Sequence, residues 1–331
     1  MTDRLQRRAV IDIGTNSVRL LVADLSRGDR PGDVALTPVL RGLETPRLGR
    51  GVDRARRLNN DAMQAAAAAV RAFAEQARSV GAKVVDVIGT SALRDAANRD
   101  EFLQLVKREC GLAVRVIDGQ EEAELSFLGA VRGVHAAPPD NTVVYVLDVG
   151  GGSTELVRGS ARGTVISVDV GAVRMTELCV RSDPISDGDW ERLVFEVRSR
   201  LRSLWRNESS AHAPVSAHHS LSASASLLAV GGTATTLAAI KQRLHVYDPE
   251  RVHGFALWRQ DVEELIRALR FAPVAQRRTW PGLQPQRADI ILAGAVIVHE
   301  VMTGLNVASV TVSESDLLEG VMLRSFETAE V

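Results

Sequence analysis

Apolar and polar positions alternate along this chain in blocks that predict strands and helices in turn. Short apolar runs predict strands at residues 9–13, 20–24, 84–88, 113–117, 143–149, 155–158, 165–170, 227–230 and 308–312. Longer amphipathic or alanine-rich stretches predict helices at residues 60–80, 101–110, 121–134, 187–206, 233–244, 260–271, 288–303 and 317–324. This alternation is typical of an α/β fold.

The pattern restarts after a loop predicted at residues 136–141. The segment LDVGGGSTELV aligns with the earlier segment IDIGTNSVRLL. Four identical residues align, namely Asp12 with Asp148, Gly14 with Gly150, Ser17 with Ser153 and Leu20 with Leu156. An internal repeat of this kind predicts two copies of one fold. We therefore expect an N-terminal domain at residues 1–128 and a C-terminal domain at residues 129–331, whose last helix can pack back on the first domain.

Length and composition agree with two domains in the cytoplasm. The chain has 331 residues, 45% of them hydrophobic and 24% charged, which suits about two globular domains. A net charge of −1 argues against nucleic acid as a partner. No apolar run approaches a signal peptide or a membrane span, and the two cysteines are expected to be free thiols. The Ser/Ala/His-rich segment 209–226 is predicted to be a surface loop or a weak helix.

The first apolar run delivers Asp12 into a short polar turn. The turn consists of Gly14, Thr15, Asn16 and Ser17. Glycine permits a tight turn whose backbone N–H groups bind anions, and the side chains of Asn16 and Ser17 add donors. A carboxylate at Asp12 close to a phosphate implies a cation between them. An ordinary β-hairpin with a polar tip is the alternative.

A second loop follows the strand predicted at residues 143–149. It holds three glycines and a serine between two acids, in the order Asp148, Gly150, Gly151, Gly152, Ser153 and Glu155. Consecutive glycines let the backbone approach a phosphate closely. The two carboxylates could share one Mg²⁺, which prefers few carboxylates together with waters and substrate phosphates. A flexible linker is the alternative, and the buried strands on both sides oppose it.

Two further loops each follow a predicted strand and open a helix. Gly231, Gly232 and Thr233 place glycines and a hydroxyl at a helix N-terminus, which favours an anion. A plain strand–helix turn would look the same. Ser91 and Arg94 come directly after another strand. A guanidinium there suits bidentate contact with phosphate oxygens, and a structural salt bridge is the alternative.

An acidic stretch begins the next predicted helix. It contains Glu121, Glu122 and Glu124, and acids in a first helical turn favour the helix dipole. One of them could instead project into a cleft and take a proton from water, but the pattern does not choose among the three. Outside these motifs, the loop residue His253 is interpreted as having a structural role. Arg19 either contacts a distal phosphate or faces solvent.

Taken together, these segments resemble the exopolyphosphatase / guanosine pentaphosphate phosphohydrolase family, within the acetate and sugar kinase/Hsp70/actin superfamily. The matching segments are DIGTNSVRLLVAD, GTSALRDAANRDEF, VIDGQEEAELSFLGA, VLDVGGGSTELV, VDVGAVRMTE, AVGGTATTLAAI, RVHGFAL and VSESDLLEGVM. They run from residue 11 to about residue 322 and form a specific set. The resemblance implies an α/β fold of two duplicated actin-like (ribonuclease H-like) domains with an active-site cleft between them.

The resemblance also implies a role for each motif. Glu122 would be the catalytic base that activates water, and Arg94 would contact the chain being cleaved. Asp148 and Glu155, with Asp12, would arrange Mg²⁺, with Mn²⁺ as an alternative. Phosphates would be held by the residues of the loops, namely Gly14, Thr15, Asn16, Ser17, Arg19, Ser91, Gly150, Gly151, Gly152, Ser153, Gly232 and Thr233.

The function implied is hydrolysis of the terminal phosphoanhydride of inorganic polyphosphate, which releases orthophosphate. The alternatives are a guanosine pentaphosphate (pppGpp) 5′-phosphohydrolase, a sugar or acid kinase, and an actin-like nucleotide-sensing or assembly module. A homodimer is compatible with the family. Residues 313–320 depart from the family's SDxGLREG pattern. Longer members carry further helical C-terminal domains that help to grip long polyphosphate, so we expect shorter substrates or weaker processivity here.

Overall fold

The chain folds into two compact units, each built around one sheet. The computed structural model describes residues 5–28, 34–133, 143–159, 164–207 and 225–328. Unit 1 comprises Met1–Gly129 and Leu317–Val331, and unit 2 comprises Ala130–Asp316. The loop predicted at residues 136–141, and all but the last two residues of segment 209–226, lie outside the described residues. The predicted cleft between the domains stays a prediction.

The sheet of unit 1 has the strand order β3-β2-β1-β4-β5. Its strands are β1 (Gln6–Ile13), β2 (Val18–Arg27), β3 (Val34–Glu44), β4 (Val84–Gly89) and β5 (Val114–Val116). β1, β2 and β3 are antiparallel neighbours, whereas β4 and β5 run parallel to β1. The hydrophobic pattern does not predict β3, because this edge strand is largely exposed and contains Pro38.

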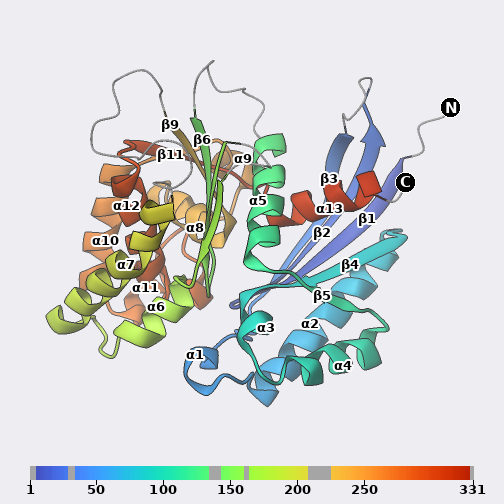
Figure 1. Ribbon diagram of the computed structural model, residues 1–331, viewed down its shortest axis with the longest axis horizontal. Coiled ribbons are helices and arrows are strands. Elements are labelled where there is room, and N and C mark those ends of the chain that lie inside the picture. The colour runs from blue at the N-terminus through green and yellow to red at the C-terminus, as the bar shows by residue number, and fades with distance from the viewer. Residues whose placement is uncertain (1–4, 29–33, 134–142, 160–163, 208–224, 329–331) are drawn as a thin grey trace. The chain divides into compact units, whose positions relative to one another are not determined.

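Helices cover both faces of this sheet (Figure 1). They are α1 (Val52–Ala55), α2 (Asn60–Ser79), α3 (Ser91–Asp95), α4 (Arg99–Cys110), α5 (Gly119–Gly133) and α13 (Leu317–Thr328). Alternate residues of β1 point to opposite faces. Ala9, Ile11 and Ile13 pack in a core with α2 and α4, while Val10 packs with Leu125 of α5 and with α13. The last helix therefore belongs to unit 1.

Unit 2 repeats this topology. Its strands are β6 (Val143–Val149), β7 (Thr154–Arg158), β8 (Thr164–Val168), β9 (Ala225–Val230), β10 (Ala256–Trp258) and β11 (Ser309–Val312). The sheet order is β10-β11-β9-β6-β7-β8. Read from β8 to β11, it has the same order and strand directions as unit 1. The structure thus confirms the duplication that the sequence repeat predicts, with β10 as an added edge strand.

The helices of unit 2 pack with one another and with the sheet in one large core. They are α6 (Ala172–Cys179), α7 (Asp187–Asn207), α8 (Gly231–Lys241), α9 (Pro249–Val252), α10 (Arg259–Phe271), α11 (Val274–Arg277), the 3₁₀ helix η1 (Pro285–Arg287) and α12 (Ile291–Gly304). α6 was not predicted, because it is only eight residues long. In the described part of the chain, no helix combines the length and apolarity needed to cross a bilayer.

Candidate active site

In unit 1 the carboxyl ends of three parallel strands present the predicted residues. The segments that follow β1, β4 and β5 are the first turn (residues 14–17), α3 with Ser91 and Arg94, and α5 with Glu122. The Thr90 N–H donates to the Ile13 carbonyl (3.2 Å), and the Ile117 N–H donates to the Gly89 carbonyl (3.0 Å). These bonds hold the strand ends side by side, and ligands of open α/β sheets bind at such ends.

Backbone contacts orient the peptide groups of the first turn. The Gly14 N–H closes the turn on the Ser17 carbonyl at 2.9 Å. The carbonyls of Thr15 and Asn16 accept hydrogen bonds from the N–H groups of Gly49 (2.8 Å) and Arg47 (3.0 Å). Because C=O and N–H point in opposite directions in a trans peptide, the following N–H groups point away from residues 47–49.

The side chain of Asn16 is a further available group in this turn. Asn16 is only 5% exposed, and neither polar atom of its amide bonds any group of the described residues. A buried polar atom without a hydrogen bond is costly, and such atoms mark ligand or water sites. The amide is therefore suited to a phosphate bound at this turn.

The second turn (residues 150–153) is built in the same way. The Gly150 N–H closes it on the Ser153 carbonyl at 3.0 Å. The carbonyls of Gly150 and Gly151 accept from N–H groups at the start of α6, at 2.9 to 3.1 Å. The Gly152 carbonyl accepts from Nε of Arg174 at 2.6 Å. All three carbonyls are thus bound on the α6 side, and their peptide N–H groups point the other way.

The duplicated hairpins place one charged pair each at the same register. Asp12 lies opposite Arg19 across β1 and β2, and Asp148 lies opposite Glu155 across β6 and β7. Oδ2 of Asp12 accepts from Nε (3.0 Å) and Nη2 (2.8 Å) of Arg19. In unit 2 the equivalent pair consists of two carboxylates, and Glu155 also accepts from the Ser167 hydroxyl at 2.7 Å. Like charges directly opposite each other are destabilising, and a divalent cation would relieve this repulsion.

The third loop adjoins the second turn. Gly231 has φ 77° and Gly232 follows it at the start of α8, as the sequence predicts. A Cβ at Gly231 would lie 2.5 Å from Oδ1 of Asp148, and one at Gly232 would lie 2.2 Å from the Arg287 guanidinium. The Thr233 hydroxyl donates to the Val149 carbonyl at 2.7 Å. Arg287 was not predicted to lie here, because no local sequence pattern connects it to this loop.

Burial distinguishes the three candidate glutamates of α5. Glu122 is 8% exposed, and its Oε2 accepts from Nη1 of Arg94 at 2.5 Å. Nη1 also donates to the Ile117 carbonyl at 3.1 Å. Glu121 instead pairs with Arg115 near the surface, and Glu124 accepts from a neighbouring glutamine. The predicted base and the predicted arginine are therefore partners in one ion pair.

The remaining candidates have structural roles. His253 Nδ1 accepts the Glu314 N–H, and Nε2 lies 3.2 Å from the Gly133 carbonyl. This requires the neutral Nε2–H tautomer and joins the end of α5 to the segment after β11. Cys110 and Cys179 are both free, as predicted. Burial raises the pKa of the Cys179 thiol to about 11, so it stays protonated at neutral pH.

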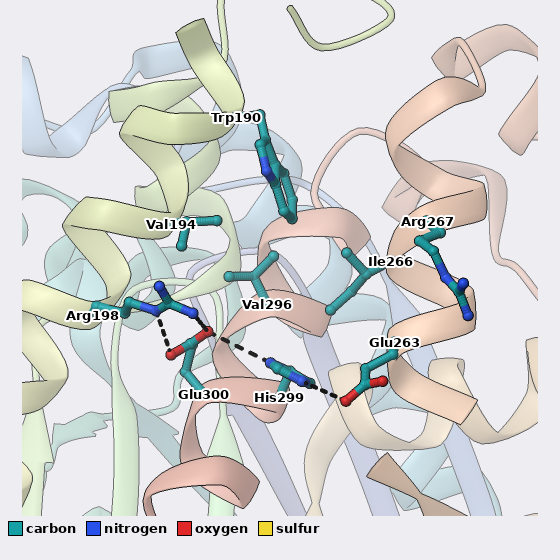
Figure 2. A pocket seen from close by; sticks show the side chains of 9 residues that line it. All are labelled: Trp190, Val194, Arg198, Glu263, Ile266, Arg267, Val296, His299 and Glu300. Carbon is teal, nitrogen blue, oxygen red and sulfur yellow. Dashed lines mark hydrogen bonds and ion pairs between the residues drawn. The ribbon is translucent and has the colours of Figure 1, made fainter. Parts of the chain in front are cut away.

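A cavity of about 510 Å³ lies elsewhere in unit 2, between α7, α10 and α12 (Figure 2). Its polar side carries a network of paired charges. Glu300 accepts from Arg198 at 2.8 and 3.1 Å, and the His299 ring lies 3.2 Å from Glu263 and 3.5 Å from Glu300. None of the predicted site residues lines this cavity. Four of its charged side chains pair with one another, whereas Arg267 is exposed and makes no ion pair with a described residue.

Comparison with known proteins decides the family. The model of the Ppx/GppA phosphatase family matches residues 29–329. The chain belongs to the Ppx/GppA phosphatase family. It is 36% identical to "Exopolyphosphatase 2" of Mycobacterium tuberculosis over 329 residues, which cover 96% of this chain and 98% of that relative. As a member of a phosphatase family, it is a hydrolase.

Solved structures of the Ppx/GppA family have the same fold. The Aquifex aeolicus family member matches with a TM-score of 0.76 and 28% identity, over 99% of this chain and 100% of that one. An exopolyphosphatase from Cytophaga hutchinsonii matches with a TM-score of 0.83 and 25% identity, over 97% and 98%. The two sheets of the present Ppx/GppA member are accordingly those of two actin-like domains.

Proposed function

We propose that this Ppx/GppA member hydrolyses the terminal phosphoanhydride bond of inorganic polyphosphate and releases orthophosphate. The observation that supports this most is the pair of duplicated turns, whose carbonyls are bound from behind while their N–H groups point outward. Backbone N–H groups that point to the same side of a turn bind anions, although the N–H groups carry no formal charge themselves. The similarity to a relative named an exopolyphosphatase supports polyphosphate as the anion.

Each residue of unit 1 then has a chemical role. The N–H groups of the first turn and the Asn16 amide would hold phosphoryl oxygens and stabilise their charge. Glu122 would orient the attacking water and accept its proton as the new P–O bond forms and the bond to the bridging oxygen breaks. Arg94 is a positioning residue in this scheme, because it fixes the Glu122 carboxylate through Nη1.

Mg²⁺ fits the carboxylates of unit 2, with Mn²⁺ as an alternative. Among the described residues, no group of three or more His, Cys, Asp or Glu side chains could hold a metal. Mg²⁺ needs no such group, because it typically uses one or two carboxylates together with water and substrate phosphates. Asp148 and Glu155 offer this pair, whereas Asp12 already receives two hydrogen bonds from Arg19. When bound, the ion would supply charge neutralisation to the phosphates.

A phosphate-release assay tests the proposal. Long-chain polyphosphate, tripolyphosphate, pppGpp and ATP are compared at equal concentrations of chain ends, with Mg²⁺ and with EDTA. We expect the fastest release from polyphosphate, its loss in EDTA and its recovery on adding Mg²⁺. For Glu155→Gln we expect about tenfold more Mg²⁺ at half-maximal rate, since one of two carboxylate ligands is lost.

Three outcomes of this assay would contradict all or part of the proposal. Faster release from pppGpp would make the chain a pppGpp 5′-phosphohydrolase. Release from ATP alone, dependent on an alcohol acceptor, would identify a kinase. A rate that is the same in EDTA would remove the metal from the mechanism.

A further inference from the structure

A strongly basic segment of unit 1 begins beside the first turn. Residues 47–57, here called the arginine strip, contain five arginines and one aspartate, so the strip carries a net charge of +4 in a chain whose net charge is −1. Arginine supplies nearly all cations of this protein, because only three of its 40 basic residues are lysines. The residue type is therefore unremarkable, and the signal is the clustering of five arginines with one aspartate in eleven residues.

Both ends of the strip are fixed to segments of unit 1 that adjoin candidate residues, and the strip starts on the side of the first turn opposite to its outward N–H groups. At its start, the backbone N–H groups of Arg47 and Gly49 bind the carbonyls of the first turn. At its end, the Ala97 N–H donates to the Arg56 carbonyl at 2.8 Å. The Asn98 amide binds both the N–H (2.8 Å) and the carbonyl (3.2 Å) of Leu58. The strip thus runs from the first turn to the segment that follows α3, and Figure 1 shows α1, which is part of the strip, beside α3.

The backbone of the strip forms successive hydrogen-bonded turns, and its two sides differ in chemistry. Successive turns are closed by the N–H groups of residues 50, 52 and 55, which bind the carbonyls of residues 47, 49 and 51. Leu48, Val52 and Leu58 are at most 4% exposed and pack in the core with α2. These apolar anchors leave the arginines on the outer side.

Three of these arginines carry charge that the described protein does not neutralise. The side chains of Arg50, Arg54 and Arg56 are exposed, and no ion pair joins any of them to a described residue. Arg57 pairs with Glu101 at 3.1 Å, but both side chains are more than half exposed, so this pair is weak. Neighbouring cations repel one another, and a bound polyanion would relieve that repulsion.

We propose that the arginine strip binds the part of a polyphosphate chain that extends beyond the terminal phosphate held at the first turn. This inference rests on the proposed function. Polyphosphate repeats one negative group along a flexible chain, so a line of separate cations matches it without further shape recognition. The strip supplies a grip on long substrates within unit 1, in contrast to the preference for shorter chains expected from the sequence.

A charge-neutralising variant tests the strip. The variant is Arg50→Gln/Arg54→Gln/Arg56→Gln. The matched control is Arg71→Gln/Arg78→Gln/Arg108→Gln on α2 and α4, which removes three exposed arginines that also make no ion pair with described residues. Both are compared with the wild-type protein for KM and kcat on long-chain polyphosphate and on tripolyphosphate, at several salt concentrations.

In the strip variant we expect the ratio of KM for long chains to KM for tripolyphosphate to rise about tenfold, with a shallower salt dependence. The control should keep the wild-type ratio. An unchanged ratio in the strip variant, or an equal rise in the control, would overturn the strip proposal. If the wild-type protein releases no phosphate from polyphosphate, the proposed function fails instead. In that case the dissociation constants of long-chain polyphosphate and of tripolyphosphate are measured instead. Their ratio in the strip variant, compared with the wild-type ratio, decides whether the strip binds long chains.

Discussion

At the scale of single residues, burial and pairing select the catalytic candidate. Three glutamates lie near the start of α5. Only Glu122 is buried, and it forms an ion pair with the partly buried Arg94. The local sequence pattern could not make this choice, because all three acids suit the start of a helix equally well, and only the family resemblance pointed to Glu122. The ion pair fixes one carboxylate in place, which is a requirement for a general base.

The substitution Glu122→Gln should lower turnover at least ~10²-fold, because the glutamine amide cannot accept the proton of the attacking water. The isosteric side chain still accepts a hydrogen bond from Arg94, so we expect the protein to remain folded. Phosphate release and thermal unfolding measure the two effects. Glu121→Gln is the matched control and should keep wild-type turnover. Near-wild-type turnover of the Glu122 variant would exclude it as the base.

One residue difference separates the charged pairs of the two hairpin copies. Asp12 and Asp148 are equivalent, but Arg19 in one copy is replaced by Glu155 in the other. The first pair is an ion pair, whereas the second places two carboxylates opposite each other. Divergence at one cross-strand position therefore accounts for the different roles that we propose for the two turns.

At the scale of elements, each turn depends on a neighbouring segment that approaches it through a glycine. A Cβ at Gly49 would lie 2.3 Å from Cγ2 of Thr15, and one at Gly171 would lie 2.3 Å from the Gly151 carbonyl oxygen. These supporting segments bind the carbonyls of the turns. The turns are thus shaped by elements distant in sequence and not by their own glycines alone.

Gly171→Ala should push the second turn away from α6, because the added methyl group meets backbone and not a flexible side chain. We expect a loss of about 1–3 kcal/mol in unfolding free energy and a higher KM for polyphosphate. Denaturant unfolding and steady-state kinetics measure these changes. Gly188→Ala, where a Cβ meets nothing within 4 Å, should retain wild-type stability and kinetics. Equal behaviour of the two variants would show that the turn tolerates displacement.

The charge network between α10 and α12 makes a pH-dependent contribution to stability. Glu300 and then Glu263, as hydrogen-bond partners, raise the pKa of His299 above its usual range, against the effect of burial. The stabilisation is fully present below the unfolded pKa of about 6.5 and is lost as pH rises through the folded value. His299→Gln should therefore lower the unfolding temperature more at acidic than at alkaline pH. A pH-independent difference would contradict this linkage.

At the scale of the whole molecule, duplication explains the architecture. Both sheets place a hairpin with one of the two proposed phosphate-binding turns at the same position in the same strand order. The helices diverged more, and unit 2 added β10. The chain returns to unit 1 at Leu317, where α13 covers β1 and β2. A homodimer and a cytoplasmic location stay predictions.

The sequence by itself determined the duplicated α/β fold, the positions of the three loops and the family resemblance. These features are encoded locally, because short apolar runs and neighbouring glycines act within a few residues. The exposed edge strand β3 was missed, because its pairing and not its hydrophobicity makes it a strand. Tertiary structure alone decided which glutamate is buried, that Arg94 holds it, and that Gly49, Gly171 and Arg287 support the loops. These contacts join residues far apart in the chain, and only packing in three dimensions brings them together.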